Sequence, residues 1–147
     1  MAERTRKTKP AKPATVRQAT LGEQLKVQSG CKDLANWPPS WMGLPEDLPP
    51  GQRIVAYFQP FLEHLLQLNL SRKTIRKHVN NLWVLGREII RDLNQTPVLR
   101  KLPVEQFVFD VLREGGPLLY HCDSQEELRS FESTCRKFQC FLEQQPR

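Results

Sequence analysis

The sequence predicts an all-α fold: a compact four-helix bundle over residues 51–143, carried behind a disordered basic N-terminal arm. Four segments repeat apolar residues at alternating intervals of three and four, the spacing that keeps side chains on one helical face. Short connections containing proline or glycine separate these segments, and a chain of 147 residues has room for one domain. These observations indicate four helices that bury their apolar faces against one another.

Residues 1–20 form the predicted arm. They carry six basic side chains against one acidic side chain, a net charge of +5, which leaves only +1 for the rest of the chain. The arm has no aromatic residue, so it cannot bury enough apolar surface to offset its conformational entropy. We therefore expect disorder, and we attribute the high isoelectric point to the arm.

Residues 21–50 are expected to be a linker or strap rich in proline and tryptophan. Five prolines lie between Asn36 and Gly51, and this density predicts neither a helix nor a central strand. Trp37 and Trp41 stand among these prolines. Because two exposed tryptophans in a solvated linker would be unusual, we expect both to pack onto the domain.

The first two helices are the longest. The first is predicted from about Gln52 to Leu68, with a kink or a short break at Pro60, which lacks an amide donor. The second begins after Ser71, a good N-cap, and runs to Asn94. Its predicted buried stripe is Ile75, Val79, Leu82, Gly86, Ile89 and Leu93. A glycine within such a stripe predicts a close helix crossing.

The last two helices have clear start signals. The third is short, with Pro103 at its first position, and it stops at the glycine pair 115–116. The fourth starts at Ser124, and Glu127 three residues later completes the pattern of a capping box. Its apolar positions are Leu128, Phe131, Cys135, Phe138 and Leu142, and residues 144–147 form a tail.

The sequence lacks the motifs of common enzymes and metal sites. It has no glycine-rich phosphate loop, no CxxC, no HExxH and no nucleophile elbow, so we predict no catalysis, no cofactor and no small-molecule substrate. The cysteines are irregularly spaced and are expected to be reduced thiols. The one alternative is a metal or substrate site that combines His121 and Cys122 with Cys135 and Cys140.

The predicted location is cytoplasmic, in a bacterial cytosol or nucleoid. No apolar run approaches the roughly 18 residues that a membrane span requires, and no signal peptide precedes the cysteines.

Basic side chains crowd the outward face of the second helix. Projected at 100° per residue, this face collects Lys73, Arg76, Lys77, Asn80, Arg87 and Arg91, with Glu88 toward its edge. Arg72 adds a further cation to the first two turns, where the helix dipole disfavours positive charge. Such a helix start suits phosphate contacts and the reading of base edges in a major groove. The candidate DNA contacts are Arg72, Lys73, Arg76, Lys77, Asn80 and Arg87, and the alternative is a solvated face that keeps the protein soluble.

Three stretches carry a resemblance to a known family. FLEHL at 61–65, LSRKTIRKHVNNL at 70–82 and FESTCRKF at 131–138 resemble the SAM-like core-binding domain of phage integrases and other tyrosine recombinases. His78 stands where that family often has an aromatic residue. The resemblance implies a helical bundle over residues 51–143 that grips duplex DNA, with contacts at Arg72, Lys73, Arg76 and Lys77. The catalytic half is not matched, because no histidine has an arginine three residues later.

Two functions follow from these patterns. We favour a non-catalytic DNA-binding module with duplex DNA as partner. The alternative is a helical protein-interaction domain in which the region of Trp37 and Trp41 docks another helix.

Overall fold

The structure is a computed structural model that describes residues 34–119 and 122–145. Within those ranges the chain is helical and contains no strand, which confirms the predicted all-α class. The predicted disordered arm, residues 1–20, lies outside the described residues, as does the 21–50 segment up to residue 33.

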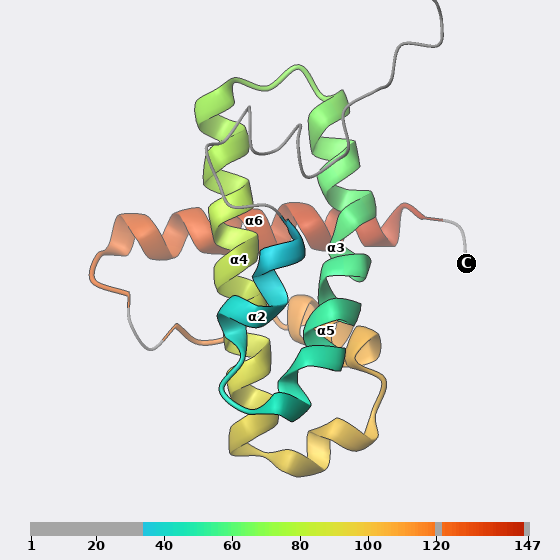
Figure 1. The fold of residues 1–147 in the computed structure, drawn as a ribbon. Helices are drawn as coiled ribbons and strands as arrows, with labels where there is room; N and C mark the ends of the chain where they lie inside the picture. Colours follow the sequence, from blue (N-terminus) through green and yellow to red (C-terminus); the bar gives the residue numbers. More distant parts are fainter. Residues whose placement is uncertain (1–33, 120–121, 146–147) are drawn as a thin grey trace, which may run out of the picture.

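Two long helices form the centre of the fold. α3 (Leu48–Gln67) and α4 (Arg72–Gln95) lie side by side and antiparallel, and the turn of residues 68–71 joins them at one end (Figure 1). The predicted stripe of α4 is buried at every position: Ile75, Val79, Leu82, Gly86, Ile89 and Leu93. The three-four periodicity therefore identified the core face of this helix correctly.

The other α-helices cover the two sides of this pair. α2 (Trp37–Trp41) packs on one side, whereas α6 (Gln125–Glu143) runs across α3 and α4 on the other side (Figure 1). α5 (Val104–Arg113) packs against both α3 and α6. The described residues thus form five α-helices, one more than predicted, and α6 crosses the central pair instead of running alongside it.

Stacked aromatic rings fix α6 to α3. The rings of Phe61 and Phe138 are parallel within 3°, with centroids 4.5 Å apart. Phe58 meets Phe138 edge to face at 5.5 Å, and all three side chains are buried. Aromatic pairs in these arrangements contribute about 0.5–1.5 kcal/mol beyond the burial of their surface, so the crossing of α6 is anchored here.

The proline-rich strap is largely helical, and the prediction that it could not be was wrong. α2 contains Pro38 and Pro39, and α3 begins at Leu48 with Pro49 and Pro50 in its first turn. Two 3₁₀ helices flank α2, namely η3 (Leu34–Asn36) and η4 (Pro45–Asp47). Proline is tolerated in a first turn because an N–H there would have no intrahelical partner. These prolines therefore mark helix starts.

Both tryptophans of the strap lie in the core, as expected, with 2% and 7% of their surface exposed. Trp41 lies over Gly86 of α4, where an added Cβ would come within 2.1 Å of its Cζ2 atom. The Trp41 indole Nε1 also donates a hydrogen bond to the carbonyl of Trp83 at 3.0 Å. The close approach predicted at Gly86 is present, and an indole from α2 makes it.

α3 continues without interruption through Pro60, so the short break considered for this position is absent. Pro60 cannot donate to the carbonyl of Ala56. Both residues are exposed, so that water can satisfy this carbonyl, and the helix avoids the cost of a buried unpaired acceptor.

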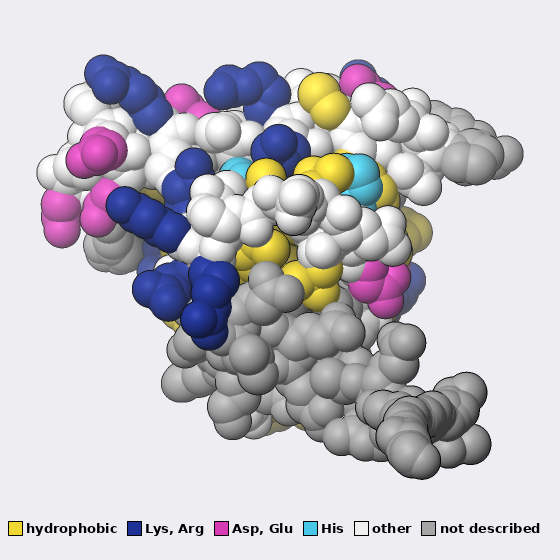
Figure 2. All heavy atoms as spheres, turned by 90° about the horizontal axis from the view of Figure 1, so that it is seen from above, with side chains coloured by type: hydrophobic (Ala, Val, Ile, Leu, Met, Phe, Trp, Pro, Cys, Tyr) yellow, Lys and Arg dark blue, Asp and Glu magenta, His cyan; other side chains and the backbone are white. Residues whose placement is uncertain are grey.

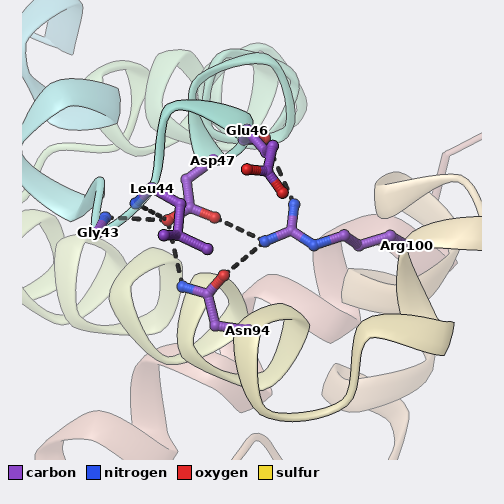
Figure 3. Close-up of polar contacts among 6 residues, drawn as sticks. All are labelled: Gly43, Leu44, Glu46, Asp47, Asn94 and Arg100. Atoms are coloured by element: carbon purple, nitrogen blue, oxygen red, sulfur yellow. Dashed lines mark hydrogen bonds and ion pairs between the residues drawn. The ribbon is translucent and has the colours of Figure 1, made fainter.

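A buried carboxylate ties the loop before α3 to the far end of α4. Asp47 is fully buried, and its oxygens accept hydrogen bonds from the backbone N–H groups of Gly43 and Leu44, from Asn94 Nδ2 and from Arg100 Nη2 (Figure 3). Arg100 belongs to η5 (Pro97–Lys101), and its Nη2 lies 2.7 Å from Asp47 Oδ1. Burial raises the pKa of Asp47, but the bonds from Arg100, Asn94 and the two amides outweigh burial and hold this pKa below its usual value.

The ends of α5 and α6 follow the predicted signals. Pro103, predicted at the first helical position, is instead the N-cap, and α5 begins one residue later at Val104. The glycines at 115 and 116 both have a φ of +99°, a region that favours glycine. Ser124 caps α6, because its Oγ accepts from the backbone N–H of Glu127 at 3.0 Å. Local capping chemistry therefore sets both boundaries.

Candidate nucleic-acid interface

α4 starts from a well-formed cap. Ser71 has an extended backbone (φ −69°, ψ 158°), and its Oγ accepts a hydrogen bond from the backbone N–H of Thr74 at 3.1 Å. The same Oγ donates to Thr74 Oγ1 at 3.0 Å. The predicted N-cap is confirmed, and it makes Arg72 and Lys73 the first two helical residues.

The structure exposes five of the six candidate contact residues. They are Arg72, Lys73, Arg76, Lys77 and Asn80, all in the first three turns of α4. Figure 2 looks onto this end of the molecule, where Lys and Arg side chains gather over α4 and α6. The first turn of α4 contains no acidic residue. Spacings of one, three and four keep these side chains together on the outward side of the helix.

α6 extends the positive surface. Arg129, Arg136 and Lys137 are exposed on it, with Glu132 among them and three further exposed carboxylates, Glu126, Glu127 and Glu143, nearer its two ends. Lys137 of α6 and Lys77 of α4 both lie close enough to the same buried imidazole to lower its pKa. The basic faces of the two helices are therefore adjacent, an arrangement that the sequence alone could not establish.

Beneath this surface, a polar network joins α4 to α6. His78 is buried, and its Nδ1 lies 2.7 Å from Thr134 Oγ1. Asn81 Nδ2 donates to Thr134 Oγ1 at 2.9 Å and to both the hydroxyl and the carbonyl of Ser130. Burial, reinforced by the nearby lysines, lowers the pKa of His78 to about 4. The imidazole is therefore neutral at pH 7 and serves packing and hydrogen bonding.

A groove of about 470 Å³ lies between α4 and α6. Lys77, Asn80 and Arg87 line one wall, whereas Glu126 and Glu127 line the other. Carboxylates on one wall repel a polyanion, so the groove itself is a poor site for phosphate. The attractive surface is the outward side of α4 next to it.

Arg87 departs from the prediction. It is only partly exposed (31%), and its Nε donates to Glu88 Oε2 at 3.0 Å. Its guanidinium carbon also lies 5.6 Å from the centroid of the Trp83 ring. Glu88, expected at the edge of the solvent face, is instead 1% exposed. Sequence reasoning missed this carboxylate because periodicity alone does not report which edge of a helix its neighbours cover.

The described cysteines do not form a metal site. No group of three or more His, Cys, Asp or Glu side chains suited to a metal ion occurs in residues 34–119 and 122–145. Cys135 is buried in the core, Cys140 is exposed and Cys122 is intermediate. His121, the fourth residue of the alternative metal or substrate site, lies outside the described residues.

None of the helices described is both long and apolar enough to cross a membrane. Comparison of the chain with protein-family models, with curated proteins and with solved structures gave no match.

Proposed function

We propose that this chain is a non-catalytic DNA-binding module, similar in role to an integrase core-binding domain, and that α4 is its DNA-contacting helix. In this proposal Arg72, Lys73, Arg76 and Lys77 contact phosphates, and Asn80 faces base edges. The observation that carries it is the grouping of these five exposed side chains on one capped helix start. Such a protein would work in the cytosol or nucleoid, where duplex DNA is found.

The energetics of the free helix favour an anionic partner. Cations near a helix N-terminus cost a few tenths to about 1 kcal/mol each, because the dipole is positive there. α4 places two cations in its first two positions, and its first turn contains no acidic residue. A phosphate backbone offsets this cost and also releases counterions, so binding should depend steeply on salt.

The test is fluorescence anisotropy of a labelled random duplex over a salt series, with the full chain and the variant Arg72→Glu/Arg76→Glu. We expect the wild type to bind with an affinity that falls linearly with salt on logarithmic axes. The double variant should bind about a hundredfold more weakly or worse, because two attractive contacts become repulsive.

The matched control is Lys101→Glu/Arg113→Glu. It changes the net charge by the same amount but alters exposed cations on η5 and at the end of α5. We expect this variant to bind nearly as tightly as the wild type. Equal losses in both variants would mean that only total charge matters, and α4 would then not be the contact helix.

A protein-interaction domain is the second candidate. Trp37 and Trp41 are buried, so they cannot form the docking surface in this conformation. Of the five large apolar side chains exposed in the described residues, four are close in sequence to Asp47 or to its ion-pair partner Arg100: Met42, Leu44, Val98 and Leu102. An apolar end of this kind suits a protein partner. Replacing Met42 and Leu102 with serine should weaken self-association or partner binding, as measured by analytical ultracentrifugation, and should leave DNA binding unchanged.

A further inference from the structure

The Arg87 side chain is held from two directions. Its Nε donates to Glu88 Oε2 at 3.0 Å, and its guanidinium carbon lies 5.6 Å from the Trp83 ring centroid. Within the described part of the chain, the two terminal nitrogens of Arg87 make no hydrogen bond. An arginine tethered through Nε and placed over an aromatic ring has lost part of its rotamer freedom before any ligand arrives.

The two groups that hold Arg87 are themselves fixed. The Trp83 indole Nε1 donates to Ser40 Oγ of α2 at 2.9 Å. Glu88 is 1% exposed, and Arg91 lies 3.8 Å from the same oxygen that Arg87 contacts. The other oxygen, Oε1, has no hydrogen-bond partner among the described residues. A buried carboxylate with one bare oxygen is costly to keep, so a purely structural reason for it is weak.

We propose that Glu88 and Trp83 are positioning residues that hold the Arg87 guanidinium as a preformed fork for two adjacent acceptor atoms of the bound nucleic acid. This inference rests on the proposed function. Arg87 lines both the α4–α6 groove and a second hollow of about 380 Å³ beside Trp41, so it lies between the two. From this position its guanidinium can reach a duplex laid along α4.

The spacing along α4 agrees with this geometry. Arg87 is eleven residues beyond Arg76, a separation of about 16 Å at 1.5 Å per residue. The major groove of B-DNA is about 12 Å wide, so the two arginines can contact opposite rims or, with a tilted helix, one rim and the groove floor. The acceptor pair for Arg87 is therefore either the two free oxygens of a phosphate or the O6 and N7 atoms of guanine.

The first test uses the full chain, its Arg87→Lys and Arg87→Gln variants, and labelled duplexes with and without G·C pairs. A bidentate contact requires the planar fork, so both variants should bind about tenfold more weakly or worse, although lysine keeps the charge. If the loss occurs only on the duplex with G·C pairs, the acceptor is guanine. An equal loss on both duplexes identifies phosphate. Wild-type affinity of Arg87→Lys would overturn the proposal, because a mobile charge would then suffice.

The second test separates positioning from charge. Glu88→Gln removes a negative charge beside the interface, so simple electrostatics predicts tighter binding. Glutamine keeps one acceptor oxygen but replaces the charge-assisted hydrogen bond with a weaker neutral one. The positioning role therefore predicts weaker binding instead, by about threefold to tenfold, because more of the ordering of Arg87 then occurs on association. Tighter binding by Glu88→Gln would refute the positioning role. Trp83→Leu, which removes the ring beneath Arg87 together with the Nε1 hydrogen bond to Ser40, should also weaken binding.

The control variant is Arg113→Lys, an exposed arginine at the end of α5, which should bind as the wild type does. Unchanged helical circular dichroism and thermal midpoint in each variant exclude unfolding as the cause of a loss.

The outcomes also distinguish the two proposals. Absence of salt-dependent binding by the wild type refutes the DNA-binding function itself. If the wild type binds, wild-type affinity in Arg87→Lys or tighter binding in Glu88→Gln refutes only this inference.

Discussion

His78 Nδ1 lies 2.7 Å from Thr134 Oγ1 in the buried contact between α4 and α6. This pair places a titratable ring directly beneath the basic surface, with Lys77 and Lys137 beside it. The same contact is one of several hydrogen bonds that join α6 to α4. Protonation of His78 therefore affects both the stability of the fold and the arrangement of the positive side chains.

Acid should therefore weaken the fold through His78. Its pKa is lowered from 6.5 to about 4 in the folded chain, so between these values the unfolded state binds a proton that the folded state excludes. Stability should be insensitive to this group above pH 6.5 and should fall by up to roughly 3 kcal/mol as the pH drops to 4. Urea unfolding at pH 7, 6 and 5 measures this slope, and His78→Gln should flatten it. Equal slopes in both proteins would contradict the assignment.

Gly86→Ala should destabilise the protein strongly. The new Cβ would lie 2.1 Å from Trp41 Cζ2, so the indole or α2 must move. Overpacking of this kind costs about 1–3 kcal/mol or more and should lower the thermal midpoint by several degrees.

Gly43→Ala is the control for this substitution. The nearest atom to its added Cβ would be Asp47 Oδ2 at 3.7 Å, an ordinary contact. Its thermal midpoint should stay close to that of the wild type. A similar loss at both glycines would mean that the indole does not restrict position 86.

Asp47→Ala should cost far more than the loss of a surface ion pair. It leaves the Arg100 guanidinium, the Asn94 amide and two backbone donors without the carboxylate that they share. Removing one partner of a buried ion pair lowers the free energy of unfolding by about 3–5 kcal/mol. Because the Asp47 pKa is lowered, the stabilisation is present above pH 3.8 and is lost as the pH falls through the folded-state value.

Glu105→Gln supplies the comparison. Glu105 accepts two hydrogen bonds from Arg53, but the two side chains are 35% and 58% exposed, so the pair is worth at most about 1 kcal/mol. Denaturant unfolding of both variants measures the difference. Equal losses would indicate that the Asp47 cluster is solvated in solution.

Thiol reactivity should separate the described cysteines. Burial raises the pKa of Cys135 to about 12, and its side chain is 1% exposed. In contrast, Cys140 is exposed on the same helix. Under native conditions iodoacetamide should label Cys140 and spare Cys135, because the reaction requires an accessible thiolate. Peptide mapping by mass spectrometry reads each site separately, and rapid labelling of Cys135 would show that α6 opens readily.

The basic surface was predictable in most of its residues, since helical projection needs only the sequence. It placed Lys73, Arg76, Lys77 and Asn80 outward, and they are exposed. The projection failed at Arg87 for a tertiary reason: α2 brings Ser40 against Trp83, and packing buries Glu88 on the edge of the same helix. A helical wheel contains neither neighbour.

The sequence by itself determined the features that depend on near neighbours in the chain. The caps at Ser71 and Ser124, the buried stripe of α4 and the stop at the glycine pair all follow from hydrogen bonds or periodicity within a few residues. Only the tertiary structure decided that the proline strap is helical, that α6 crosses α3 and α4, and that His78 and Glu88 are buried. The physical reason is that burial depends on groups distant in sequence, and no local pattern encodes which of them will meet.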